Sequence, residues 1–339
     1  MLGSMEISEA VLADYDELYP LYLDAMAVGN PKAPLVSRRT FDAFKTHPFP
    51  DQANLRFVGR VDGVLVAMST FEAPTQENTD RLLLAVVVHP DHRRKGYGMA
   101  LHDHAMAWAR ANGRTIISAS TFVSIEGCPI PEPGSAFVRH LGYQPALPEV
   151  ARQFVVADVD EAEHDRLLAD AWAAAGGYRT VRWVGVPPDD LIEDVAYLDS
   201  RLITDAPMGE LELEPEKVTP ERIREREAAM AERGRQTVHT GVVHEATGRL
   251  VAWSTICLDP EVETGHAMQF ITLVDPDHRG HRLGTVVKIE NLRYARRIQP
   301  NLSRITTWNA AANGYMIRIN EALGFRPAYG QMEWQLALT

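Results

Sequence analysis

A long internal repeat constrains this sequence more than any other feature. Three short strings recur in the same order, and the pairs are LVAMSTF (65–71) with LVAWSTI (250–256), VHPDHR (88–93) with VDPDHR (274–279), and LGY (141–143) with LGF (323–325). Their spacing of about 185 residues is that of a domain, not of a solenoid repeat. The sequence therefore predicts a duplicated domain, with copies at 5–157 and 178–339 and a helical linker at 158–177.

The first copy alternates helical and strand patterns. Apolar residues at Leu18, Leu21, Tyr22 and Ala25 follow a helical period and predict a helix over about Ser8–Met26. Asp62-Gly63 predicts a hairpin turn between two strands. The remaining predicted elements are the hairpin strands 57–61 and 64–70, a buried strand 82–88, a helix 98–111 and a strand 115–120.

The second copy repeats this order. Its predicted elements are a hairpin 242–244 and 250–256, a strand 270–274, a helix 283–297, a strand 305–308 and a final helix that ends at Gly324. An additional helix is predicted at 219–233, because Thr219-Pro220 is a favourable cap and first helical position.

The loop Arg93-Arg94-Lys95-Gly96-Tyr97-Gly98 lies between a predicted strand and a predicted helix. Unpaired N–H groups at the positive end of a helix bind phosphate groups. Gly96 and Gly98 allow the backbone to approach a pyrophosphate, since they carry no Cβ. The three basic side chains add positive charge. We therefore expect a phosphate-binding cradle here, whereas the same string in isolation is typical of a plain surface turn.

This loop resembles the acyl-CoA signature of the GNAT N-acetyltransferase superfamily, Q/R-x-x-G-x-G/A after the fourth strand. The resemblance covers nearly the whole chain, once per half, and the layout is similar to tandem GNAT proteins of the mycothiol synthase type. It implies an α+β fold: two GNAT folds in tandem, each a mixed, mostly antiparallel sheet flanked by helices. The sheet splays between its fourth and fifth strands, and the cofactor, acetyl-CoA or another acyl-CoA, binds there.

The resemblance also implies which residues bind the cofactor. In the first copy they are Val86, Val87, Val88, Arg93, Arg94, Lys95, Gly96, Tyr97, Gly98 and Met99. In the second copy they are Leu273, Val274, Arg279, Gly280, His281, Arg282, Leu283, Gly284, Asn309 and Asn313.

The two copies depart from the family pattern in opposite ways. In the second loop Arg282 replaces the middle glycine, and its side chain either obstructs a pyrophosphate or grips it. The second copy has Asn309 and Asn313 after its fifth strand, as in the superfamily's thioester end. The first copy instead carries a proline-rich insertion at 127–135. The sequence thus predicts a better phosphate loop in the first copy and a better thioester end in the second.

Catalytic residues are less clearly marked. Many superfamily members place a general-acid tyrosine four residues before the final glycine, where this chain has Val138 and Asn320. Asn320 is expected to hydrogen-bond the departing sulfur, and Tyr315 lies nearby on another helical face. A general base must deprotonate an ammonium group. Asp80 in the first copy and Glu263 in the second are the candidates, and ordinary turn charge is the alternative explanation.

Composition excludes several classes of protein. No apolar run approaches the length of a membrane span. The net charge of -12 disfavours nucleic-acid binding. Two distant cysteines favour a reducing, cytoplasmic setting over a disulfide framework. The histidines at 89, 92, 102 and 104 lack the spacing of a zinc site, so no metal is expected.

We therefore expect an N-acetyltransferase that transfers acetyl from acetyl-CoA to a small-molecule amine, with chemistry in the second copy. The alternatives are an acyl-CoA-binding protein in which one or both halves do not catalyse transfer, and a protein-lysine acetyltransferase. The sequence leaves the acceptor and the oligomeric state open, because acceptor residues lie on variable loops.

Overall fold

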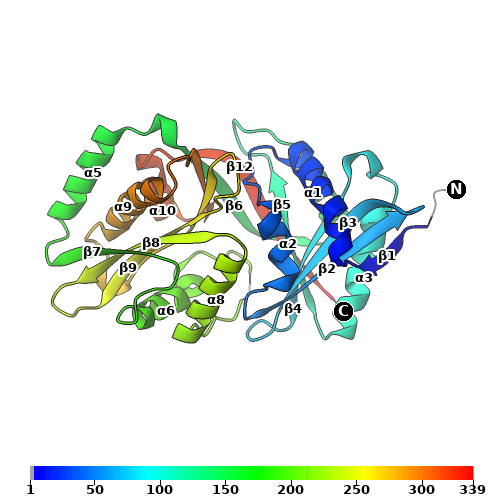
Figure 1. Ribbon diagram of the computed structural model, residues 1–339, viewed down its shortest axis with the longest axis horizontal. Helices are drawn as coiled ribbons and strands as arrows, with labels where there is room; N and C mark the ends of the chain where they lie inside the picture. Colours follow the sequence, from blue (N-terminus) through cyan, green and yellow to red (C-terminus); the bar gives the residue numbers. More distant parts are fainter. Residues whose placement is uncertain (1–3, 212, 339) are drawn as a thin grey trace. The chain divides into compact units, whose positions relative to one another are not determined.

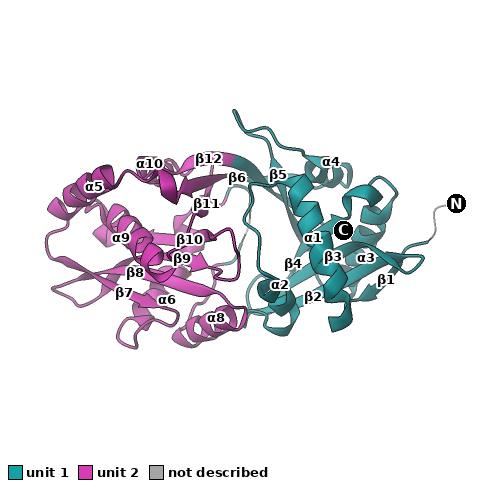
Figure 2. Cartoon of the chain, turned by 45° about the horizontal axis from the view of Figure 1, so that its top comes forward, with its two compact units in different colours: residues 1–149, 209–214, 329–339 teal, residues 150–208, 215–328 magenta. Residues whose placement is uncertain are grey.

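The chain is divided between two units, and neither unit is contiguous in sequence. The computed structural model describes residues 4–211 and 213–338. Unit 1 comprises residues 1–149, 209–214 and 329–339, and unit 2 comprises residues 150–208 and 215–328 (Figure 2). This division by contacts departs from the contiguous domains expected from the repeat. Each unit takes a strand from the other sequence copy.

Unit 1 is a mixed sheet with helices on both faces. Its strands lie in the order β1-β2-β3-β4-β5-β12, and only β4 and β5 are parallel among the registered pairs. The elements are β1 (Glu6–Glu9), η1 (Leu12–Asp14), α1 (Tyr15–Gly29), α2 (Arg38–Thr46), β2 (Gln52–Val61), β3 (Val64–Pro74), β4 (Arg81–Val88), η2 (Pro90–His92), α3 (Tyr97–Ala111), β5 (Ile116–Val123) and α4 (Pro133–His140), with β12 (Arg326–Ala337) (Figure 1).

Alternation along the strands places two apolar clusters on opposite faces of this sheet. Val58 and Met68 pack against Leu18 of α1 and Phe41 of α2. Neighbouring strand residues such as Phe57 face α3 and α4 on the other side. The predicted hairpin is confirmed, since Asp62 and Gly63 have φ values of 51° and 81°.

The first predicted helix begins later than expected. Glu6–Glu9 form an edge strand that pairs antiparallel with β2, so Ser8 is not helical. A 3-10 turn follows, and α1 begins at Tyr15. The apolar stripe identified the helix correctly. The residues before it pair with β2, and this pairing satisfies their backbone hydrogen-bonding groups.

Unit 2 has the same layers. Its strands lie in the order β6-β11-β10-β9-β8-β7, and β10 and β11 are parallel. The elements are β6 (Gln144–Val155), η3 (Val156–Asp158), α5 (Glu161–Ala173), β7 (Tyr178–Val184), α6 (Ile192–Ser200), α7 (Leu202–Asp205), α8 (Pro220–Glu232), β8 (Gln236–His244), β9 (Leu250–Leu258), β10 (His266–Val274), η4 (Pro276–His278), α9 (Leu283–Ile298), β11 (Arg304–Ala310) and α10 (Gly314–Ala322) (Figure 1).

The expected linker is part of the core of unit 2. Leu168 and Ala171 of α5 pack in the same cluster as Val286 and Ile289 of α9. Asp160 caps α5 by accepting a hydrogen bond from the Glu163 N–H at 3.0 Å. The segment 158–177 therefore contributes buried apolar surface and does not act as a spacer.

The last strand of each sequence copy completes the sheet of the other copy. β12, from the second copy, lies next to β5, and β6, from the first copy, lies next to β11. Residues 330–337 of β12 pair antiparallel with β5 in unit 1, where Trp334 is 2% exposed. The Trp334 indole donates to Thr121 Oγ1 at 2.8 Å. Phe154 of β6 is equally buried in the core of unit 2, against Phe325. Each core therefore needs an aromatic residue from a strand that the linear repeat assigns elsewhere.

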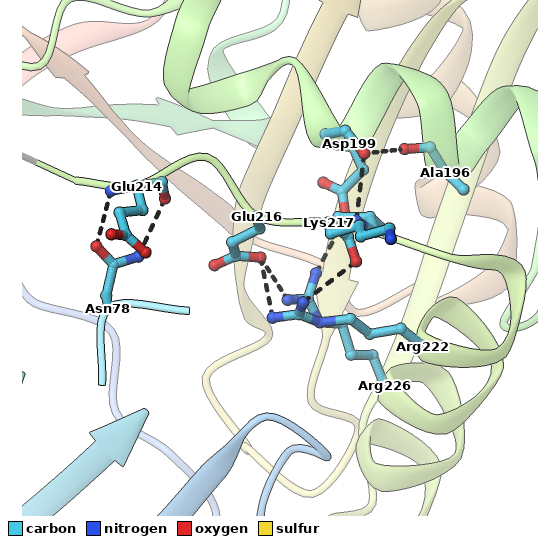
Figure 3. A network of polar contacts seen from close by, with 10 residues as sticks. Asn78, Ala196, Asp199, Glu214, Glu216, Lys217, Arg222 and Arg226 are labelled. Atoms are coloured by element: carbon cyan, nitrogen blue, oxygen red, sulfur yellow. Dashed lines mark hydrogen bonds and ion pairs between the residues drawn. The ribbon is translucent and has the colours of Figure 1, made fainter. Parts of the chain in front are cut away.

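Segment 209–214 is fastened within unit 1. The Asn78 amide donates to Glu214 O at 3.0 Å and accepts from the Glu214 N–H at 2.8 Å (Figure 3). The Glu210 N–H donates to Ala146 O at 2.8 Å. These bonds explain why residues within the second copy belong to unit 1.

A charged network fastens α8 within unit 2. The Arg226 guanidinium pairs with Asp199 of α6 at 3.1 Å and with Glu216 at 2.5 Å (Figure 3). The predicted cap of α8 is confirmed, because Thr219 Oγ1 accepts from the Arg222 N–H at 3.2 Å. Among the residues that the structure describes, no helix is long and apolar enough to cross a membrane.

Candidate functional site

The predicted phosphate cradle of unit 1 is a tight loop between β4 and α3. Two of its residues, Arg94 and Gly96, have left-handed φ values of 64° and 87°. Arg93 Nε donates to Val88 O at 3.2 Å, and Lys95 Nζ donates to Asp91 O at 3.2 Å. Within the described chain, no side chain caps the start of α3. Its first N–H groups therefore point toward the loop at the positive end of the helix, where an anion binds favourably.

The cradle of unit 2 follows the same backbone path and also has two left-handed residues. Its glycine is the first of the two, whereas in unit 1 the glycine is the second. Gly280 has φ 89°, and Arg282 has φ 55° and ψ 21°. The pair Arg94 and Gly96 is thus replaced by glycine and then arginine. A left-handed arginine costs about 1 kcal/mol relative to glycine. Arg282 is exposed and leaves the path of the loop intact, so the backbone of the cradle is preserved in both copies.

The side chains around the second cradle are more engaged than those around the first. Arg279 forms an ion pair with Asp205 of α7 at 3.0 Å. His281 Nδ1 lies 3.1 Å from Ala174 O, and Tyr178 Oη lies 2.9 Å from Nδ1 of His278. The two cradles therefore differ in available positive charge and not in backbone geometry.

Several predicted binding residues are limited to their backbone atoms. The side chains of Tyr97 and Leu283 are 6% and 1% exposed and lie in the cores of their units. A Cβ added at Gly98 would meet Phe137 at 3.4 Å, and one added at Gly284 would meet Ile319 at 3.3 Å. These glycines keep the start of each long helix close to the last helix of its sequence copy.

Each sheet forks next to its cradle. In unit 1 the parallel pairing of β4 with β5 ends at Leu83 and Ser118, and Leu84–Val88 have no registered partner on β5. In unit 2 the pairing of β10 with β11 ends at Gln269 and Thr307. The predicted splay is confirmed in both units, and it exposes one edge of the strand that leads into each cradle. Val86–Val88, Leu273 and Val274 lie on these edges.

A β-bulge distinguishes the fork of unit 2. Gln269 pairs with Ile256 and Thr272 pairs with Ser254, so Phe270 and Ile271 together oppose a single residue of β9. Such a bulge leaves a residue unpaired and redirects the backbone locally. In unit 1 the register between β3 and β4 runs unbroken from Leu83 to Val88. Gln269 is the last residue of β10 that pairs with β11, and the bulge begins at the next residue, Phe270.

The predicted asparagines lie beside this fork. Asn309 is near the end of β11 and is 9% exposed, and Asn320 of α10 is fully buried. The Asn320 amide donates to Asn309 Oδ1 at 2.7 Å. Asn313 caps α10 by accepting from the Met316 N–H at 3.2 Å. Asn320 therefore holds Asn309 in place, and its burial does not fit the expected direct bond to sulfur.

The other catalytic candidates lie at the surface. Tyr315 is 56% exposed on the first turn of α10. Glu263 is exposed in the turn before β10, and Asp80, the corresponding acid in the first copy, directly precedes β4. Nearby, burial lowers the pKa of His266 on β10 to about 4, and its ring lies 2.6 Å from Thr306 Oγ1. His266 is therefore neutral near pH 7 and was not marked by the sequence pattern.

Comparison with known proteins agrees with this geometry. Residues 15–126 match the Acetyltransferase (GNAT) family. A solved tandem GNAT protein from the clavulanic acid biosynthesis pathway is 29% identical, with a TM-score of 0.81 and coverage of 98% of each chain. The family match thus covers residues 15–126, and the likeness to the tandem GNAT protein extends over the whole chain. No curated protein matches the sequence.

A GCN5-related N-acetyltransferase from Sphaerobacter thermophilus shares the fold alone. It is 14% identical, with a TM-score of 0.65, and the alignment covers 99% of this chain and 97% of that one. The expectation of two GNAT folds in tandem is thus confirmed. The narrower likeness to mycothiol synthase stays a prediction.

Within this GNAT framework, sequence reasoning missed the bulge and the polar side chains beneath it. Gln269, Ser254 and Lys288 form a buried hydrogen-bonded group under the fork of unit 2. Lys288 stands between Val287 and Ile289, both fully buried. A lysine within the apolar stripe of a predicted helix was the signal that could have revealed it.

Proposed function

We propose that this GNAT protein transfers acetyl from acetyl-CoA to the amine of a small molecule by direct attack, and that transfer takes place in unit 2. The observation that carries this proposal is the bulge at Phe270–Ile271, which lies at the fork between β10 and β11. It supports placing a backbone N–H of β10 where the thioester oxygen becomes negative. A preorganised donor at that point lowers the barrier to acyl transfer.

In this mechanism the neutral amine attacks the thioester carbonyl carbon, the C–S bond breaks and CoA leaves as a thiolate. As the amide forms, the nitrogen releases its second proton, which balances the proton that the thiolate takes up. The nucleophile first loses a proton, because a free ammonium group has a pKa of about 10. Glu263 is the candidate acceptor of that proton through water, since it is exposed in the turn before β10. Asn309, held by Asn320, would orient the sulfur-proximal part of the substrate. Tyr315 is the remaining candidate for protonating the thiolate.

We assign unit 1 a binding role without transfer. Its cradle keeps Gly96 and the side chains of Arg94 and Lys95, which favours binding of the CoA phosphates. Its β4 has no bulge, and the insertion 127–135 replaces the asparagines of unit 2. The two units would therefore bind the same cosubstrate for different purposes.

A thiol-release assay with acetyl-CoA and a panel of small amines tests the proposal. We expect amine-dependent release of CoA, abolished by Gly284→Glu and retained in the matched variant Gly98→Glu. Each substitution places a carboxylate beside the start of the cradle helix, next to Ile319 in unit 2 or Phe137 in unit 1. Loss of activity in Gly98→Glu alone would reverse the assignment of the units.

A binding protein without turnover is the second candidate. Val138 and Asn320 occupy the positions at which many superfamily members have a general-acid tyrosine, which favours this candidate. So does Asp205, because it neutralises Arg279 beside the second cradle. Calorimetric titration with acetyl-CoA separates the two functions. Tight binding without amine-dependent thiol release across the panel would reject the enzyme and retain the binding protein.

A further inference from the structure

A buried hydrogen-bonded group spans the bulge of unit 2 on the side that faces α9. Gln269 Nε2 donates to Ser254 Oγ at 2.8 Å and reaches Thr272 Oγ1 at 3.5 Å. Ser254 Oγ lies 3.0 Å from Thr272 Oγ1. Lys288 Nζ donates to Gln269 Oε1 at 2.5 Å. Gln269 and Thr272 are the two residues that flank the register shift, so a single side-chain amide bridges the bulge.

Lys288 determines the orientation of that amide. The oxygen and nitrogen of a glutamine side chain are similar in shape, so its hydrogen-bond partners decide which end points where. The ammonium form of lysine can only donate and therefore selects the oxygen, as the bond from Lys288 Nζ to Gln269 Oε1 shows. The amide nitrogen then faces the two hydroxyls, to which it donates. Without Lys288 the amide is free to reverse, and its bridge across the bulge is weakened.

Nothing else in the surroundings accounts for a lysine at this position. Lys288 is 3% exposed, and burial lowers its pKa to about 7. Among the described residues it has no carboxylate partner, and its other contact is the Phe325 ring at 5.3 Å. Burying an amine without a counter-charge is unfavourable. The amine therefore makes a specific hydrogen bond at a cost to stability.

Unit 1 provides an internal comparison, because it has the same strands without the bulge. Ser69 pairs with Val86 as Ser254 pairs with Thr272. Leu84 replaces the glutamine, and His102 replaces the lysine and lies 3.2 Å from Tyr143 Oη. Ser69 Oγ is buried with no hydrogen-bond partner among the described atoms. The clamp and the bulge are thus present together in one copy and absent together in the other.

We propose that Lys288 and Gln269 form a clamp that fixes the β10 bulge and thereby aims the backbone N–H groups of Phe270 and Ile271 at the acyl carbonyl. Lys288 is on this view a positioning residue that does not touch the substrates. The kinetic part of the inference rests on the proposed function of unit 2. The structural part, that Lys288 fixes the bulge, does not.

The test compares Lys288→Met and Gln269→Leu with Ile289→Val in the full chain. Lys288→Met and Gln269→Leu each remove the clamp with little change in side-chain volume. Gln269→Leu also installs the leucine that unit 1 has at the corresponding position, Leu84. The control removes one methylene from a fully buried neighbour on the same helix and leaves the clamp intact. We expect kcat to fall by about 10-fold or more in both clamp variants, because loss of an oxyanion donor outright costs about 10²–10³-fold. The KM for acetyl-CoA should change less than about threefold in the same variants, since the cradle that binds the phosphates is untouched.

Amide hydrogen exchange at residues 270–272 provides a readout that does not depend on turnover. We expect faster exchange there in Lys288→Met than in wild type and in Ile289→Val. Unchanged exchange would overturn the clamp. Faster exchange with unchanged kcat in an active enzyme would overturn the kinetic part of the inference alone. If wild type shows no turnover but exchange rises, the clamp stands and the proposed function fails. If Lys288→Met does not fold, Gln269→Leu carries the same comparisons.

Discussion

Replacing Lys288 with methionine tests the burial of this amine through the pH dependence of stability. The lysine has an ordinary pKa of 10.5 in the unfolded chain and a pKa of about 7 in the folded protein, because burial disfavours its charged form. Between these values the unfolded state binds more protons than the folded state. The free energy of unfolding should therefore rise with pH in this window.

The magnitude follows from the size of the shift. One pKa unit corresponds to about 1.4 kcal/mol, so the slope contributed by Lys288 is about 1 kcal/mol per pH unit between pH 7 and 10. The contribution is fully present above the unfolded pKa and is lost as pH falls toward 7. Lys288→Met removes the titrating group and keeps the length of the side chain.

Urea unfolding at pH values from 7 to 9.5 measures this slope in wild type and in the variant. The quantity of interest is wild type minus variant, because the difference cancels other titrating groups. We expect it to rise with pH by about 1 kcal/mol per unit. Lys32→Met, which removes an exposed lysine, is the control and should give no such rise. A flat difference for Lys288→Met would refute the placement of a desolvated amine in the core.

Three further predictions concern the cradle, the cysteines and a helix cap. Gly96→Ala should lower the free energy of unfolding by about 1 kcal/mol in urea, because φ is +87° although the space for a Cβ is open; an unchanged value would contradict the left-handed backbone. Native labelling with a disulfide reagent should modify half-buried Cys128 well before Cys257, whose pKa burial raises to about 12; equal rates would refute this order. Thr219→Ala should cost about 1 kcal/mol of stability by removing the cap of α8, while Thr219→Ser should retain most of it in the same urea assay.

The elements with a local signal were predicted well. The hairpin turn at Asp62-Gly63, the helix that begins near Gly98 and the cap at Thr219 all depend on residues close in sequence, and the structure contains them. Boundaries were less accurate where pairing decided them. Ser8 follows a helical pattern but lies in an edge strand, because β2 offers it a backbone partner.

In the candidate site, too, features with a local sequence signal were predicted and features that depend on tertiary contacts were not. Its cradles were predicted because strand, glycine loop and helix are consecutive in the chain. The roles of Asn309 and Asn320 were less accessible, since their hydrogen bond joins two elements and buries one of them completely. The ion pair between Arg279 and Asp205 joins residues far apart in sequence, so no spacing in the chain announces it.

By itself the sequence determined the duplication, the layers of each copy and the position of both candidate phosphate-binding loops. These properties are written in repeats, periodicity and turn chemistry, which act over a few residues. Only the tertiary structure decided which strand completes each sheet, because β12 and β6 are chosen by the cores that bury Trp334 and Phe154. It also placed the bulge in one copy, where Lys288 and Gln269 meet across a helix and a strand. Burial and pairing depend on residues that the chain brings together only after folding.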